Sequence, residues 1–154
     1  SFEFLALEIH RPLPTDLGIS YAQPALMALA HLLEHPRVRP ATMSGLVEGR
    51  RIKRSAKDLG RVLAIAALAG PDAVETWPAG WMEALRECFP ARWQDLVQNA
   101  GSGLRELLGS RDDLEQATWT CNQGLLASRP LSPEQLRATG LRVLQDAADV
   151  LASS

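Results

Sequence analysis

The sequence has 154 residues, of which 46% are hydrophobic, and a formal net charge of −2. This length fits one domain whose core buries about two thirds of the unfolded surface, so folding requires neither disulfides nor metals. No apolar run approaches the ~20 residues of a membrane span and no basic-then-apolar leader is present, which excludes a membrane partner and predicts a cytoplasmic chain. Cys88 and Cys121 stand in apolar contexts without a Cys/His pairing, as the free thiols of a reducing compartment do, and a disulfide between them is the alternative.

The first third of the chain predicts a strand, a linker and a helix. Residues 1–9 form a short apolar run whose length and aromatic residues favour a strand, and residues 1–20 fit a strand and linker from a preceding domain. From Pro24 the apolar residues recur with a helical period at Leu26, Leu29, Ala30 and Leu33. We expect Pro36 to end this helix and residues 36–49, with Pro40, to form a loop or an interrupted helix.

A second helix is predicted from about Ser55, which is suited to an N-cap. Its broad apolar face belongs in a core and consists of Leu59, Val62, Leu63 and Ala66, widened by Ile65 and Leu68. Gly70 and Pro71 end this helix, and residues 72–81 predict a turn-rich passage.

Three further helices complete the prediction. One opens at Pro90 and runs to Leu108, and the next begins at Asp112. The last has the clearest start, because Ser132, Pro133 and Gln135 supply an N-cap, a first-turn proline and a capping-box glutamine. Its expected core stripe is Leu136, Gly140, Val143, Ala147 and Val150. The expected fold class is mainly α: a compact bundle of five or six helices, with room for one short N-terminal strand, in a single helical domain over residues 1–154.

Charge is distributed unevenly along the chain. Residues 37–61 carry eight basic and two acidic side chains, a net +6, which leaves −8 for the remainder of the −2 total. The dense part, which we call the basic cluster, consists of Arg50, Arg51, Lys53, Arg54, Lys57 and Arg61. Guanidinium and ammonium groups before and on the first turns of a helix hold phosphate oxygens, so the cluster predicts binding of a nucleotide or a nucleic-acid backbone. The alternatives are a solvated face, a surface for the chain's own acidic residues and a surface for an acidic protein partner.

Asp58 is the carboxylate within the dense part of the cluster. If the helix begins near Ser55, Arg54 lies four residues before Asp58 and Arg61 three residues after it. Ion pairs with these guanidinium groups would hold the carboxylate ionised and oriented. An ordinary exposed ion pair, worth less than ~1 kcal/mol, is the alternative.

Several segments around the basic cluster resemble a known protein family. The Ala/Leu-rich stretch from Ala25 to Leu33, the pair Arg50-Arg51 and the run Ala56-Lys57-Asp58-Leu59 resemble bacterial nucleotidyltransferase-like proteins of the toxin-related type, in the helical region downstream of their catalytic sheet. The resemblance covers about residues 24–68. It departs from the family at Leu32, where lysine is common. The family's Gly-Ser turn, followed by a strand with paired metal-binding carboxylates, has no counterpart.

The resemblance implies that Lys57 and Asp58 approach a nucleotide phosphate, with Arg50 and Arg51 beside them. It also implies that this chain is the helical part of a larger enzyme, or a relative that has lost transfer chemistry. The chain alone would then hold no cofactor and no complete catalytic centre, and Mg²⁺ would belong to a catalytic domain elsewhere. The expected partners are a nucleotide or an acidic protein, with nucleic acid, a preceding catalytic domain or a second copy of the chain as further options.

Other residues suggest packing rather than chemistry. His31 and His35 have a metal-ligand spacing on one helix face, but no third ligand accompanies them, so a packed or capping role is expected. Gly109-Ser110 before Asp113 is interpreted as a helix cap. Four tryptophans lie away from the basic cluster in sequence and predict core or interhelical packing rather than base stacking: Trp77, Trp81, Trp93 and Trp119.

Overall fold

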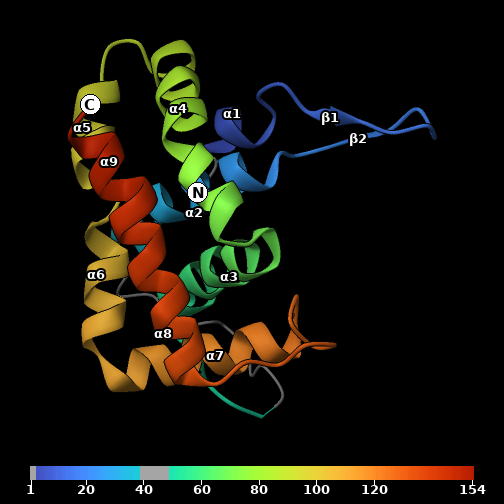
Figure 1. Ribbon diagram of the computed structural model, residues 1–154, viewed down its shortest axis with the longest axis vertical. Helices are drawn as coiled ribbons and strands as arrows, with labels where there is room; N and C mark the ends of the chain where they lie inside the picture. Colours follow the sequence, from blue (N-terminus) through green and yellow to red (C-terminus); the bar gives the residue numbers. More distant parts are fainter. Residues whose placement is uncertain (1–2, 39–48) are drawn as a thin grey trace.

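The computed structural model describes residues 3–38 and 49–154, and over these residues the fold is mainly α-helical, as predicted (Figure 1). The elements in chain order are α1 (Leu5–Glu8), β1 (Leu13–Pro14), β2 (Ser20–Tyr21), α2 (Pro24–Val38), α3 (Arg54–Ala69), α4 (Pro71–Cys88), α5 (Trp93–Asn99), α6 (Ser102–Gly109), α7 (Arg111–Gln123), α8 (Pro133–Arg142), the π-helical turn η1 (Val143–Ala148) and α9 (Asp149–Ala152). Pro36 does not end α2, which continues to Val38, and residues 39–48 of the predicted loop lie outside the described residues. Over the described ranges, no helix is both long enough and apolar enough for a membrane span.

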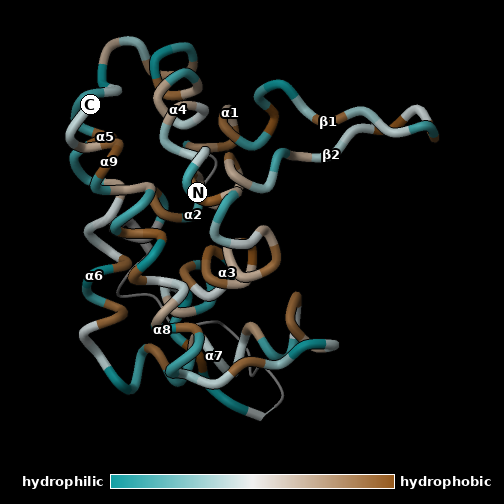
Figure 2. The backbone as a smooth tube through the Cα atoms, in the orientation of Figure 1, coloured by the Kyte–Doolittle hydropathy of each residue, from teal (hydrophilic) through white to brown (hydrophobic). Residues whose placement is uncertain are grey.

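Helix α3 occupies the middle of the fold and contacts α2, α4, α6, α7 and α8. Figure 2 shows hydrophobic residues along its second half. The predicted stripe is buried, apart from the exposed Leu68. The helix begins at Arg54 with Lys53 at the N-cap, so Ser55 lies buried in the first turn instead of capping it. The later members of the basic cluster therefore stand on the first two turns of the central core helix.

The strand predicted over residues 1–9 is wrong, because Leu5–Glu8 forms the short helix α1. Phe4 and Leu7 are both buried, and their separation of three residues places them on one helical face. The Phe4 ring packs edge-to-face on Phe89, with 5.7 Å between the ring centroids. This contact with the end of α4 favours a helix where the local pattern suggested a strand.

The strands lie farther along and form an arm, residues 13–21, that extends away from the helices (Figure 1). β1 and β2 are antiparallel, with Leu13 opposite Tyr21 and Pro14 opposite Ser20. Gly18 has a φ of 73° in the connecting turn, a left-handed conformation that glycine adopts at little cost.

Residues 72–81, predicted to be turn-rich, lie inside α4. Pro71 takes the favoured first-turn position, and the helix continues through Pro78. An internal proline costs about 3 kcal/mol, whereas full burial of one large apolar side chain contributes ~1.5–3 kcal/mol. Several such side chains recur here at helical spacing and are buried, which outweighs the cost of the proline: Val74, Trp77, Trp81 and Leu85.

The helix predicted from Pro90 to Leu108 is divided into α5 and α6. The division falls near Gly101, where a Cβ atom would lie 3.2 Å from Ala148 Cβ and from Leu144 Cδ2. The C-terminal helical segment therefore approaches closely here, and a larger residue at position 101 would press on it.

The C-terminal helix starts as predicted, with the capping box of Ser132 and Gln135 formed in both directions. Its expected stripe is buried as far as Ala147, but Val150 is exposed and Leu151 is buried in its place. The π-helical turn η1 explains the shift, because its wider turn moves the buried face along by one residue.

Candidate functional site

The candidate site is a pocket of about 260 Å³ between α1, α2 and the first two turns of α3, which we call the polar pocket. Its walls are formed by Phe4, Leu5, Glu8, Ala30, His31, Glu34, Arg54, Lys57, Asp58 and Arg61. Four of the seven predicted site residues therefore line one pocket: Arg54, Lys57, Asp58 and Arg61.

Three cations form the α3 side of this pocket. Arg54, Lys57 and Arg61 are spaced three and four residues apart, which places them on one face of the helix. Arg54 and Arg61 are exposed and Lys57 is half-buried. Among the side chains that the structure describes, none makes a hydrogen bond or an ion pair with these three groups. Within the described part of the chain, these three charges are therefore not paired.

Two of the three acidic groups of the pocket are more buried than its cations. Asp58 and Glu34 are buried, while Glu8 is half-buried. Asp58 faces α2, where its Oδ1 lies 3.9 Å from His31 Nδ1. The predicted ion pairs of Asp58 with Arg54 and Arg61 do not form in the described part of the chain, because the aspartate is turned toward the helix interface.

Burial and the surrounding charges shift the pKa of His31. Burial lowers the pKa of the imidazole below the ordinary 6.5, and Arg61 lowers it further, whereas Asp58, Glu8 and Glu34 act in the opposite direction. The neutral imidazole is therefore favoured at physiological pH, and at 3.9 Å its contact with Asp58 is too long for a hydrogen bond. The expected packed role of His31 is confirmed by its burial between α2 and α3, whereas the side chain of His35 lies outside the described residues.

The rest of the basic cluster lies outside this pocket, and two of its members contact α7. Lys53 Nζ is 2.7 Å from Asp113 Oδ1, and its backbone N–H donates to Gln116 Oε1 at 3.0 Å. The Arg50 guanidinium lies over the Trp119 ring, 5.3 Å from the ring centroid. Arg51 is exposed, with no hydrogen bond or ion pair to the described side chains. The prediction that all seven residues share one site is therefore wrong for Arg50, Arg51 and Lys53, which precede α3 and do not line the polar pocket; Arg50 and Lys53 instead contact α7.

Trp119 lies beside Arg50 of the basic cluster in space, although it is distant from the cluster in sequence. Trp77 and Trp81 are buried, as predicted. Trp119 contacts Arg50 although 69 positions separate them, a relationship that only the packing of α7 beside the start of α3 creates. Ser110 has the predicted cap role, because its Oγ accepts a hydrogen bond from Asp113 N.

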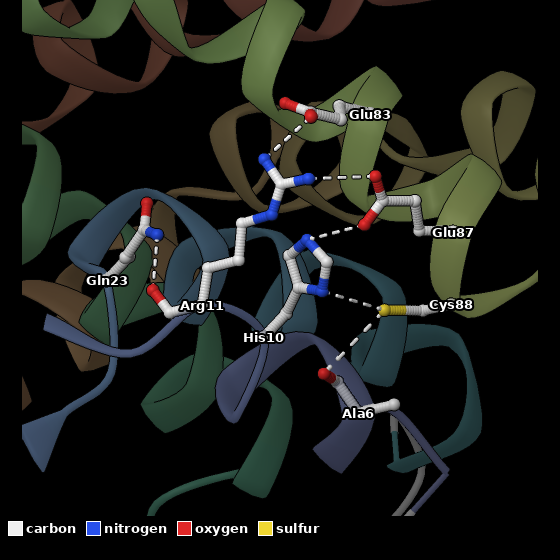
Figure 3. Close-up of polar contacts among 7 residues, drawn as sticks. All are labelled: Ala6, His10, Arg11, Gln23, Glu83, Glu87 and Cys88. Atoms are coloured by element: carbon white, nitrogen blue, oxygen red, sulfur yellow. Dashed lines mark hydrogen bonds and ion pairs between the residues drawn. The ribbon is translucent and has the colours of Figure 1, made fainter.

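A second polar cluster, which sequence reasoning missed, lies at the base of the arm (Figure 3). Arg11 donates to Glu83 at 2.7 Å and to Glu87 at 2.9 Å, and His10 lies between Glu87 and Cys88. Burial raises the pKa of the Cys88 thiol, and the Glu87 carboxylate raises it further. The thiol is therefore protonated at neutral pH and is a poor nucleophile. This cluster fastens the segment before the arm to α4.

No group of three or more His, Cys, Asp or Glu side chains in the described residues is placed to hold a metal ion. No protein-family model, curated protein or solved structure matches this chain. The resemblance to nucleotidyltransferase-like proteins therefore stays a prediction.

Proposed function

We propose that this chain is the helical domain of a nucleotidyltransferase-like protein and that its polar pocket holds phosphate groups of a nucleotide. One observation carries the proposal. Arg54, Lys57 and Arg61 line the same wall, and none of them is engaged by a described side chain. Transfer chemistry and Mg²⁺ would then be supplied by a catalytic domain elsewhere, and this chain would contribute binding and orientation.

The arrangement of charge suits an anion at the mouth of the pocket. The exposed guanidinium groups of Arg54 and Arg61 present paired N–H donors that match phosphate oxygens, and Lys57 adds a point charge between them. The buried carboxylates of Asp58 and Glu34 would repel an anion, but Asp58 is turned toward His31. A phosphate would therefore bind at the cationic rim and not at the acidic floor.

Thermal unfolding with tripolyphosphate tests the proposal. A ligand at a hundred times its Kd stabilises the folded state by about 2.7 kcal/mol, which raises the Tm of a chain of this size by roughly 5–10 °C. Lys57→Gln and Arg61→Gln should each remove most of this shift. Arg142→Gln, which replaces an exposed arginine outside the pocket, should leave it unchanged.

A second readout reports on the pocket directly. A bound polyanion near Arg61 should raise the pKa of His31, because negative charge favours the imidazolium form. NMR titration of the His31 ring with and without tripolyphosphate measures this change. The proposal fails if tripolyphosphate neither stabilises the chain nor moves this titration. A stabilisation that Arg142→Gln reduces as much as Lys57→Gln also contradicts it, since that pattern indicates screening of surface charge.

Contact with a protein partner is the second candidate, favoured by the arm. Leu17, Ile19 and Tyr21 are exposed on the arm, whose two short strands form a ribbon that is only marginally stable alone in water. If the chain functions through a protein partner at the arm, tripolyphosphate should leave the Tm unchanged and Leu17→Ser should weaken association with that partner. A ligand whose affinity falls steeply with salt and rises with strand length would instead indicate a nucleic-acid backbone.

A further inference from the structure

A second and larger pocket of about 510 Å³ lies on the other side of Lys57 and Arg61. We call it the apolar pocket, and it is lined by Met27, Lys57, Gly60, Arg61, Ala64, Ile65, Thr120, Cys121, Gln123, Gly124 and Leu125. Its walls come from α2, α3 and the end of α7. The two pockets share Lys57 and Arg61, so they adjoin along one edge of α3.

We propose that the apolar pocket takes the nucleobase of the nucleotide whose phosphates lie at the rim of the polar pocket. This inference rests on the proposed function and adds the class of ligand: a mononucleotide with an aromatic base, rather than a bare polyphosphate. Lys57 and Arg61 would then stand where the phosphates join the organic part of the ligand.

Size supports this division of the ligand between the two pockets. Pockets that enclose small organic molecules commonly measure ~300–1,000 Å³. The polar pocket, at about 260 Å³, falls below this range, whereas the apolar pocket, at about 510 Å³, falls within it. The polar pocket alone is suited to an inorganic anion, and the neighbouring volume is suited to a ring system.

The lining chemistry also suits a flat aromatic ring. Met27, Ile65 and Leu125 provide apolar surface, and a methionine thioether makes favourable contacts with aromatic rings. At the end of α7, the exposed Gln123 amide makes no hydrogen bond with the described residues, so both its donor and its acceptor are available to a base edge. Thr120 Oγ1 donates to Gln116 O at 2.9 Å and keeps its lone pairs for a donor on the ligand.

Isothermal titration calorimetry tests the proposal by comparing the affinities of ATP and tripolyphosphate for the wild type and two variants. Leu125→Ser removes apolar surface from the proposed base site. Leu68→Ser is the matched control, because Leu68 is 53% exposed against 52% for Leu125 and lies outside both pockets. Both variants should fold, since neither side chain is buried, and circular dichroism checks this before the titration.

We expect ATP to bind the wild type roughly tenfold or more tightly than tripolyphosphate. Leu125→Ser should weaken ATP binding about fivefold and leave tripolyphosphate binding unchanged. Leu68→Ser should change neither affinity.

Two failures are distinguishable. If tripolyphosphate binds in a Lys57-dependent manner but ATP binds no more tightly, or if Leu125→Ser leaves ATP binding unaltered, the base site is overturned and phosphate recognition stands. If tripolyphosphate and ATP both fail to bind, phosphate recognition fails and the base site fails with it.

Discussion

His31 Nδ1 lies 3.9 Å from Asp58 Oδ1 across the interface of α2 and α3, and both side chains are only 12% exposed. Burial lowers the pKa of His31, while the Asp58 carboxylate opposes this effect. Asp58→Asn should therefore lower the pKa of His31 further, and Arg61→Gln should raise it. NMR titration of the imidazole in the three proteins measures both changes. Equal shifts in the same direction for the two variants would contradict this account of the pocket's electrostatics.

The lowered pKa of His31 also predicts how stability depends on pH. The unfolded chain, with a histidine pKa near 6.5, binds the proton more readily than the folded chain does. The contribution of His31 is therefore fully present above pH 6.5 and is lost as the pH falls toward the folded-state pKa. Urea unfolding from pH 8 to pH 5 should show this loss, and His31→Gln should flatten that part of the profile. A wild-type profile no steeper than that of the variant would refute the prediction.

Gly60 lies where α3 packs closely against α7. A Cβ atom there would lie 3.1 Å from the backbone oxygen of Ala117, and Gly60 O accepts a hydrogen bond from Cys121 Sγ at 2.8 Å. Gly60→Ala should therefore destabilise the fold by ~1–3 kcal/mol, because the backbone of α7 must move. Gly80→Ala is the control, since a Cβ atom there meets nothing within 4 Å, and it should stabilise α4 by up to ~1 kcal/mol. Denaturant unfolding measures the free energy of unfolding of both variants. If Gly60→Ala leaves it unchanged, α3 and α7 can accommodate the added methyl group without a loss of stability.

The capping box of α8 predicts a measurable local contribution. Ser132 Oγ accepts from Gln135 N at 3.1 Å, and Gln135 Oε1 accepts from Ser132 N at 2.9 Å. Ser132→Ala should cost about 1 kcal/mol of unfolding free energy, because it leaves a helix N–H without its partner. Ser128→Ala changes an exposed serine that makes no hydrogen bond with the described residues, and should be neutral. If the two variants have the same Tm, the capping box contributes nothing to stability.

The two thiols should differ from free cysteine in reactivity. Burial raises the pKa of Cys121 to about 12, so almost no thiolate exists at pH 8 and alkylation should require unfolding. Burial and Glu87 raise the pKa of Cys88, and Glu87→Gln should lower it and speed alkylation at this site. Mass spectrometry of native and urea-unfolded protein after iodoacetamide treatment measures each thiol. Fast native labelling of Cys121 would show that α3 and α7 separate readily.

Features encoded within a few residues were predictable from the sequence. The apolar period of α3 from Leu59 to Ala66 and the start of α8 at Ser132 each depend on neighbours within one or two helical turns. The errors at α1 and α4 share a different cause. Phe4 finds its partner in Phe89, and the helix through Pro78 is stabilised by burial against other elements, which local patterns do not contain.

The candidate site, like the fold, was only partly predictable from the sequence. The sequence alone determined that cations gather at the start of a core helix, because charge and apolar period are both read directly along the chain. Only the tertiary structure decided that Arg54, Lys57 and Arg61 face a pocket and that Lys53 forms an ion pair with Asp113. It also decided that an apolar pocket lies beside the polar pocket. These relationships depend on how α1, α2 and α7 pack around α3, and such packing is set by burial between segments far apart in the chain.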